Sequence, residues 1–245
     1  MDEGALDGIR LISVDRPGFG LSDMCPGRRI IDWPFDIAVL ADHLGVERFH
    51  VLGVSGGGPY ALACAVALPD RVAGAAIVCG GAPSDRVDMF SGMSDMNSLV
   101  FGAARDDPSH LRELLEAMQV ALEASGGGVP VMLDDLCVAD QAALADPAFA
   151  TMLGAGMREA FRQGAAGPVD DMVLFVSPWG FDPAEVTVDV VVAHGDLDVN
   201  VPVSCGEWLA VTIPSARFLR FADDGHFSLA ARSHEIVAGM LDTVD

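Results

Sequence analysis

A serine flanked by glycines, Ser55, is the residue of this sequence best suited to nucleophilic chemistry. It lies in GVSGGGPYALA (53–63), where Gly53, Ser55 and Gly57 fit the pattern Gly-x-Ser-x-Gly. An apolar stretch, FHVLGVS (49–55), precedes it, and small residues follow. A sharp turn from strand to helix would strain the backbone at Ser55 and expose its hydroxyl, and the glycines would remove the Cβ clashes of that turn. The alternative is a glycine-rich turn without chemistry.

A serine hydroxyl needs a base to take its proton and an acid to orient that base. Of the six histidines, His226 is the best candidate, because it lies in the polar loop DDGHFSL (223–229) between an expected strand and an expected helix. His194 is the rival, but it ends an apolar strand, where a packed histidine is expected. The remaining histidines lie in or beside helices and strands without a catalytic context: His43, His50, His110 and His234.

The acid is expected on a loop that follows a strand. The segment HGDLDVNVP (194–202) offers two candidates there, Asp196 and Asp198. The order along the chain is then serine, aspartate, histidine, which differs from the order in two other common classes of serine hydrolase. The helix that follows Ser55 would direct its first N–H groups, beginning at Gly56, toward the same place.

The elements that must position these residues alternate between strands and helices. The patterns predict strands over 11–14, 49–55, 72–80, 186–195 and 216–222, and helices over 30–44, 56–68, 203–212 and 229–243. Strand, helix and strand in this rhythm indicate an α/β fold, with a mostly parallel sheet and helical crossovers on its faces.

The rhythm stops between residue 84 and about residue 181, where no convincing strand occurs. This stretch holds helical segments such as HLRELLEAMQVALEA (110–124) and ATMLGAGMREAFRQG (150–164), and SGGGVP (125–130) separates them as a loop. Its methionines fit either an adaptable apolar binding wall or ordinary helix packing. We therefore expect a helical cap at 84–181, inserted between two parts of one core domain, 1–83 and 182–245.

The composition of the chain argues against nucleic-acid binding, membrane insertion and secretion. The chain has 245 residues, 51% of them hydrophobic, which is enough for a sizeable core. Its net charge is −22 and every basic side chain is arginine, so a basic groove for nucleic acid is not expected. No apolar run reaches the roughly 18 residues of a membrane span, and the acidic N-terminus shows no secretion signal.

The number and spacing of the cysteines indicate a protein of a reducing compartment. The five residues, at 25, 64, 79, 137 and 205, are odd in number and lack the spacing of a zinc site. Cys64 and Cys79 lie in apolar runs, where they are expected to pack as small hydrophobic residues. We expect a cytoplasmic, bacterial protein without disulfides, bound metal or cofactor. Its partner would be a small-molecule substrate, not nucleic acid or a membrane, and a homodimer stays open.

Four segments together resemble the α/β-hydrolase fold family, in that family's order: DRPGFGLSD, GVSGGGP, HGDLDVNVP and DDGHFSL. EAFRQG (159–164) and PWGF (178–181) further resemble a lidded group of bacterial and plant small-molecule hydrolases. The resemblance implies an α/β-hydrolase core under a helical cap.

The resemblance also implies roles for individual residues. Ser55 maps to the nucleophile, His226 to the base, and Asp198 to the acid, since the family's acid falls third after the glycine that is here Gly195. Asp196 would then be structural. Gly53, Gly56 and Gly57 map to the nucleophile turn, where Gly56 N–H would be one of two oxyanion donors. Trp179 and Phe181 lie near the return from the cap, where Trp179 either lines the pocket or packs the hinge.

One departure concerns the N-terminus. In the family, a hairpin, a further strand and a helix precede D-x-P-G-x-G, and a loop among them supplies the second oxyanion donor. Such a segment takes about 35–45 residues, whereas ten residues precede Leu11 here. We expect that Met1 is an internal methionine of a longer protein. The alternatives are a variant that completes its sheet by another route, such as a partner chain, and a degenerate relative that no longer catalyses.

Two functions from different classes follow. The first is a serine hydrolase that cleaves a small or medium carboxylic ester through an acyl-enzyme. Serine at the nucleophile position argues against the family's haloalkane dehalogenases and epoxide hydrolases, which use aspartate, while amides, thioesters, C–C bonds and acyl transfer stay open. The second is a degenerate, hydrolase-like protein that binds a small molecule with little turnover.

Overall fold

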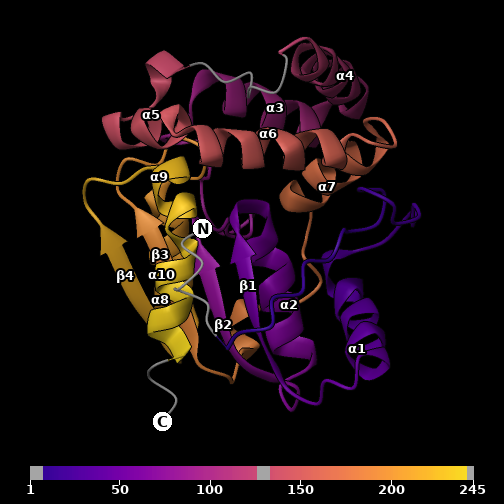
Figure 1. Ribbon diagram of the computed structural model, residues 1–245, viewed down its shortest axis with the longest axis vertical. Helices are drawn as coiled ribbons and strands as arrows, with labels where there is room; N and C mark the ends of the chain where they lie inside the picture. The colour runs from indigo at the N-terminus through magenta and orange to yellow at the C-terminus, as the bar shows by residue number, and fades with distance from the viewer. Residues whose placement is uncertain (1–7, 126–132, 242–245) are drawn as a thin grey trace.

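A four-stranded parallel sheet forms the centre of the computed structural model, which describes residues 8–125 and 133–241. The strands lie in the order β1-β2-β3-β4, with bounds Phe49–Val54, Val72–Val78, Val190–Gly195 and Ala216–Phe221. Because all three pairings are parallel, the carboxyl ends of the strands lie at one edge of the sheet (Figure 1).

The two central strands are apolar on both faces, and their side chains alternate between two separate cores. In β2, Ala75 and Ile77 belong to the core formed with α1, α2 and α8, whereas Ala76 and Val78 belong to the core formed with α9 and α10. The helices that build these two layers are α1 Trp33–His43, α2 Gly58–Ala67, α8 Val203–Thr212, α9 His226–Ala231 and α10 Ser233–Leu241. This alternation explains why β2 and β3 read as continuous apolar runs.

Five further helices form a layer across the carboxyl ends of the strands (Figure 1). They are α3 Asp95–Asp106, α4 Pro108–Ala124, α5 Val138–Ala145, α6 Pro147–Ala160 and α7 Ala166–Val176. They have an apolar cluster of their own that includes Leu111, Leu122 and Phe161. Between residues 84 and 181 the described residues contain no strand, as the sequence predicted. The predicted loop SGGGVP lies, from residue 126 on, outside the described residues.

The strand predicted over residues 11–14 is wrong. This segment forms no strand, and Leu11 and Ile12 are 60% and 41% exposed. A strand is stable only beside a neighbour that accepts and donates its backbone hydrogen bonds. Among the described residues β1 pairs with β2 alone, and Leu52 on β1 is 39% exposed. The segment 11–14 therefore has no place in the sheet.

The other predicted elements are present, with shifted ends. The helices predicted from residues 30 and 56 each open with a 3-10 turn, Ile30–Asp32 and Ser55–Gly57. The last predicted helix is divided into α9 and α10. Every helix of the described ranges is too short or too polar to cross a membrane.

A buried ionic cluster joins the cap to the core. Asp171 on α7 accepts hydrogen bonds from Arg16 Nε and from the Tyr60 hydroxyl, both at 2.6 Å, and from the Arg28 guanidinium. Arg28 also donates to the Tyr60 oxygen at 2.6 Å. Asp171 and Arg28 are 2% and 8% exposed. Burial, together with the Asp171 carboxylate, raises the pKa of Tyr60, so the phenol keeps the proton that it donates.

We expect Asp171→Asn to lower the free energy of unfolding by about 3–5 kcal/mol, because two guanidinium groups lose their buried counter-charge. Urea denaturation measures the loss. Asp170→Asn is the matched control, since Asp170 is the adjacent carboxylate on α7 and is only half-buried. Equal stability of the two variants would contradict a structural role for the cluster.

Candidate active site

Ser55 lies at the junction of β1 and α2 in a strained conformation. Its φ angle is 53°, in the left-handed region that non-glycine residues rarely adopt. The turn Ser55–Gly57 leads directly into α2, so the N–H groups of the first helical turn face the same edge of the sheet. The serine of the sequence pattern is therefore held by the strand-to-helix turn that the pattern predicts.

Two of the three predicted glycines have close neighbours, and at Gly53 these neighbours are backbone atoms that cannot move aside. A Cβ atom on Gly53 would lie 2.5 Å from the carbonyl oxygen of Gly57, so the turn could not fold back against the end of β1. A Cβ atom on Gly56 would lie 2.6 Å from the ring of Phe175 on α7. Gly57 differs from the expectation, because nothing lies within 4 Å of a Cβ atom placed there. The backbone of the turn therefore requires glycine at position 53. At position 56 the neighbour is the end of the Phe175 ring on α7.

Asp198 and His226 form a buried pair. His226 Nδ1 and Asp198 Oδ2 are 2.8 Å apart, and the two residues are 6% and 4% exposed. The other carboxylate oxygen, Oδ1, accepts the N–H groups of Asn200 and Val201, each at 2.8 Å. Asp198 follows β3 and His226 follows β4, so neighbouring parallel strands bring them together. The backbone bonds orient the carboxylate toward the imidazole.

The charges of this pair stabilise each other. Burial alone would raise the pKa of Asp198, but the facing His226, together with His194, holds it well below its usual range. Burial likewise disfavours the imidazolium, but the Asp198 carboxylate, with a contribution from Asp140, raises the pKa of His226 above its usual value. The surroundings of His226 therefore favour its protonated form.

No hydrogen bond joins Ser55 to His226 in the structure, and within the described ranges the Ser55 hydroxyl has no partner at all. The three predicted residues nevertheless follow the ends of β1, β3 and β4, and these ends lie at the carboxyl edge of the sheet, beneath the layer of α3 to α7 (Figure 1). In enzymes without bound substrate the contact between nucleophile and base is often long and tightens when substrate binds.

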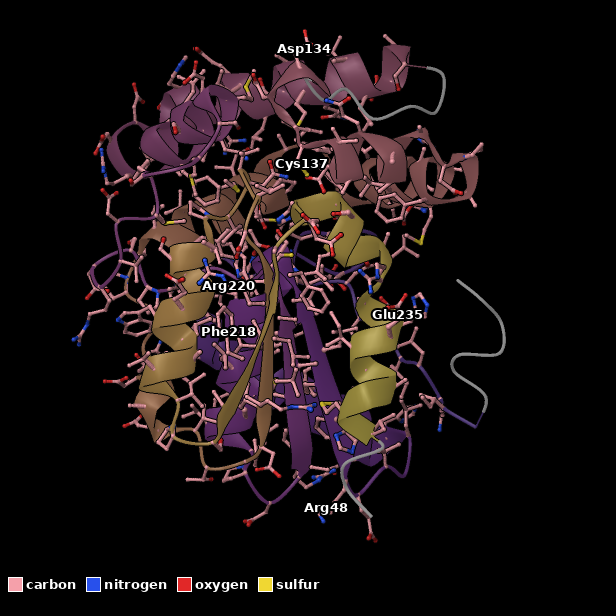
Figure 2. The ribbon with its side chains drawn as sticks, turned by 90° about the vertical axis from the view of Figure 1, so that its left-hand side faces the viewer. Arg48, Asp134, Cys137, Phe218, Arg220 and Glu235 are labelled. Atoms are coloured by element: carbon pink, nitrogen blue, oxygen red, sulfur yellow. The ribbon has the colours of Figure 1, made fainter. Side chains whose placement is uncertain are left out.

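The rejected candidates have other contacts. His194 is fully buried, with Nε2 2.8 Å from the Val201 carbonyl oxygen and 3.5 Å from Asp198 Oδ2. It is a packed histidine behind Asp198, and this contact was not predicted. Asp196 pairs at 2.5 Å with Arg220 on β4, which is labelled in Figure 2.

The aromatic residues near the end of the cap pack against the core. Trp179 is 3% exposed within the main core, its Nε1 donates to the Phe175 carbonyl oxygen at 3.4 Å, and its ring centre is 5.8 Å from that of Phe181. Of the two roles weighed for Trp179, the structure therefore favours packing at the hinge.

A cavity of about 790 Å³ opens beside Asp198, between the core loops and the start of α5. Its lining includes Asp88, Asp135, Asp196, Leu197 and Asp198, but neither Ser55 nor His226. No basic side chain is among the described residues that line it. Neither Trp179 nor Phe181, the two residues considered for either the pocket or the cap, belongs to its lining.

Sequence reasoning missed two residues at the site. Cys79 ends β2 with a φ angle of 51°, and its sulfur lies 3.8 Å from the His226 carbonyl oxygen. Burial, with the Asp198 carboxylate nearby, raises the pKa of its thiol, so Cys79 is not a thiolate nucleophile. Asp140 on α5 accepts the N–H group of His226 at 3.0 Å. No local pattern marks either residue, because their partners are distant in sequence.

A parallel sheet, a serine in a strained strand-to-helix turn, and an aspartate–histidine pair that follows β3 and β4 define the alpha/beta hydrolase class. A family model described as the alpha/beta hydrolase fold matches residues 1–231, and the chain belongs to this family.

Relatives within the family have several activities. A 2-hydroxy-6-oxononadienedioate/2-hydroxy-6-oxononatrienedioate hydrolase of Paraburkholderia phymatum is 40% identical over 93 residues, which cover 36% of this chain and 32% of that protein. The chain thus spans about a third of the length of the first curated relatives that it matches. A pimeloyl-[acyl-carrier protein] methyl ester esterase of Nitrosomonas europaea is 28% identical over 238 residues, covering 92% of this chain and 84% of the relative.

A solved structure shows the same fold. The esterase RhEst1 from Rhodococcus sp. ECU1013 superposes with a TM-score of 0.64 at 24% identity, over 96% of this chain and 81% of that one. At this identity the likeness supports the fold and leaves the substrate to be argued from the site.

Proposed function

We propose that this protein is a serine hydrolase that cleaves a carboxylic ester of small or medium size, with Ser55 as nucleophile, His226 as base and Asp198 as acid. The observation that carries the proposal is the buried 2.8 Å contact between His226 and Asp198 at the sheet edge where Ser55 is held at a φ angle of 53°. The relative from Nitrosomonas europaea, matched over most of both chains, is named a methyl ester esterase.

The reaction follows from these positions. Ser55 Oγ attacks the ester carbonyl carbon while His226 Nε2 takes the hydroxyl proton, and the Asp198 carboxylate stabilises the imidazolium that forms. The N–H group of Gly56 donates to the oxygen that becomes negative. His226 then returns the proton to the departing alkoxide, which leaves as an alcohol, and Ser55 carries the acyl group. Water, deprotonated by His226, attacks this acyl-enzyme and releases the carboxylic acid.

The acidic cavity beside Asp198 favours the approach of an uncharged substrate. Asp88, Asp135 and Asp196 line it without a basic residue among its described lining, and the chain has a net charge of −22. Neither Ser55 nor His226 lines this cavity, so its charge acts on the approach of a substrate and not on the reacting atoms. A substrate with two carboxylates would be repelled as it approaches, because the chain carries a net negative charge. A neutral ester meets no such penalty.

The second candidate is cleavage of a C–C bond, which the 40% identity to the Paraburkholderia phymatum relative favours. Initial rates on p-nitrophenyl esters of graded acyl length, and on a 2-hydroxy-6-oxo-dienedioate, decide between the two. We expect kcat/KM to be higher for an ester than for the dicarboxylate. The reverse ranking would overturn ester specificity, and binding without turnover of any of these compounds would indicate the degenerate binding protein.

The charge of His226 sets the expected pH dependence. His226 must be neutral in order to accept the proton of Ser55. Burial lowers the pKa of His226, but the facing Asp198 carboxylate has the larger combined effect and raises it. We therefore expect kcat/KM to rise with pH through an apparent pKa above about 6.5, the ordinary value for histidine. A pH–rate profile of ester hydrolysis measures it. An acidic limb centred below that value would contradict the pairing of His226 with Asp198.

A further inference from the structure

The helix α9, which starts at His226, has no side chain at its N-cap position that could accept its first N–H groups. The residue before it is Gly225, which lacks a side chain, although the first N–H groups of a helix need acceptors. The structure supplies one from a distant element. Asp140, on cap helix α5, accepts His226 N–H through Oδ2 at 3.0 Å and Ser228 N–H through Oδ1 at 2.8 Å.

This contact is tight and buried. Asp140 has 0% exposure, the lowest of any acidic residue among those described as buried. A Cβ atom on Gly225 would lie 2.4 Å from Asp140 Oδ2, so a side chain at position 225 would displace the carboxylate. The Gly225 N–H is taken by the Ser228 hydroxyl at 2.9 Å, which completes the bonding of this turn. Glycine at position 225 therefore suits a cap supplied by another element.

We propose that Asp140 is a positioning residue for His226, through which the cap holds the base in place for Ser55. His226 is then held at two points. Asp198 bonds its ring from the loop after β3, and Asp140 bonds its backbone from α5. Figure 2 shows Cys137, next to the start of α5, on the side of the cap that faces the core, while Asp134 lies at the outer surface. A shift of α5 relative to the core would shift the imidazole.

The charged and titratable groups close to His226 come from four places in the fold. They are Asp198 after β3 with His194 behind it, Asp140 on α5, Cys79 at the end of β2, and the Asp224–Arg232 pair before and after α9. Only Asp140 belongs to the cap. Removing its charge therefore changes the electrostatics of the base without altering the acid that orients it.

The test compares two aspartates of the cap with the same local chemistry. Asp146 accepts the N–H groups of Ala148 and Phe149 at the start of α6, each at 2.9 Å, and it is exposed. Asp140→Ala and Asp146→Ala each remove a carboxylate that caps a helix. We expect Asp140→Ala to lower kcat for a p-nitrophenyl ester by about 10²-fold with little change in KM, since misplacement by about 1 Å costs that much. Asp146→Ala should keep the kcat of the unmodified protein.

The variant Asp140→Asn distinguishes a role in positioning His226 from a role in stability alone. The amide keeps the shape and one acceptor oxygen, so part of the lost kcat should return relative to Asp140→Ala. Its lost charge should move the pKa of His226, read by NMR and from the acidic limb of kcat/KM, to lower pH. Asp146→Asn should move neither. Equal kcat in Asp140→Ala and Asp146→Ala, or an unmoved His226 pKa in Asp140→Asn, would overturn the proposal.

A measurement on the unmodified chain covers the case in which the Asp140 variants do not fold. The amides of His226 and Ser228 should exchange with solvent far more slowly than that of exposed Asp223, and similar rates would overturn the proposal. The inference rests on the proposed function, because it takes His226 to be the base. Hydrogen exchange and the pKa measured by NMR do not require turnover. Failure to hydrolyse any ester would therefore overturn the proposed function, and these two measurements would still decide whether Asp140 holds His226.

Discussion

Ser55→Ala should reduce kcat for ester hydrolysis by about 10⁶-fold, the loss expected when the nucleophile of a serine triad is removed. The residual rate would come from substrate binding and the oxyanion donor. Stability should change little, because alanine removes one oxygen that has no hydrogen-bond partner among the described residues. Steady-state kinetics and thermal denaturation of the same preparation measure the two effects.

Ser109→Ala is the matched control for this change. Ser109 is an exposed serine in the first turn of α4, in the cap, and its hydroxyl has no place in the proposed reaction. We expect it to retain full activity. A Ser55→Ala protein that is folded and still turns over ester at a rate near that of the control would remove Ser55 from the reaction.

Asp198→Asn should lower kcat by about 10⁴-fold, because an amide facing His226 Nδ1 favours the wrong tautomer of the imidazole. The amide also cannot stabilise the imidazolium that forms when Ser55 loses its proton. Backbone contacts of Oδ1 with Asn200 and Val201 would be kept, so the loop should stay folded. Measured kcat with unchanged near-UV circular dichroism would establish a catalytic effect.

The nearby Asp196 provides the comparison. Asp196 pairs with Arg220, and among the described residues no hydrogen bond or ion pair joins it to His226, so Asp196→Asn should change kcat little. Any effect on substrate approach through the cavity should appear in KM. Partly exposed ion pairs contribute about 0–1 kcal/mol, so the loss of stability should also be small. A larger loss of kcat in Asp196→Asn than in Asp198→Asn would show that the acid is Asp196.

The sequence predicted those parts of the molecule that local pattern determines. The turn around Ser55, the polar loop around His226 and the apolar runs of β2 and β3 each have a residue pattern that only a few backbone conformations satisfy. The choice of Asp198 over Asp196 came from family resemblance, and the structure places Asp198, not Asp196, against His226.

What sequence reasoning missed depends on contacts between distant segments. Asp140 meets its partner 86 residues away, and Arg16 meets Asp171 155 residues away, so neither pairing leaves a periodic signal. The segment 11–14 has the composition of a strand, but a strand also needs a neighbour, and composition does not show whether one is present. Gly57 fits the pattern Gly-x-Ser-x-Gly without a steric need for glycine.

The central claim is that Ser55 is activated by His226 and Asp198, and labelling by a fluorophosphonate tests it most directly, since the probe reacts with an activated serine. Intact mass spectrometry followed by peptide mapping should show one adduct per chain, located on Ser55, that forms more slowly in Asp198→Asn and not at all in Ser55→Ala. An adduct on another residue, or an unlabelled Ser55 in protein that hydrolyses esters, would contradict the account.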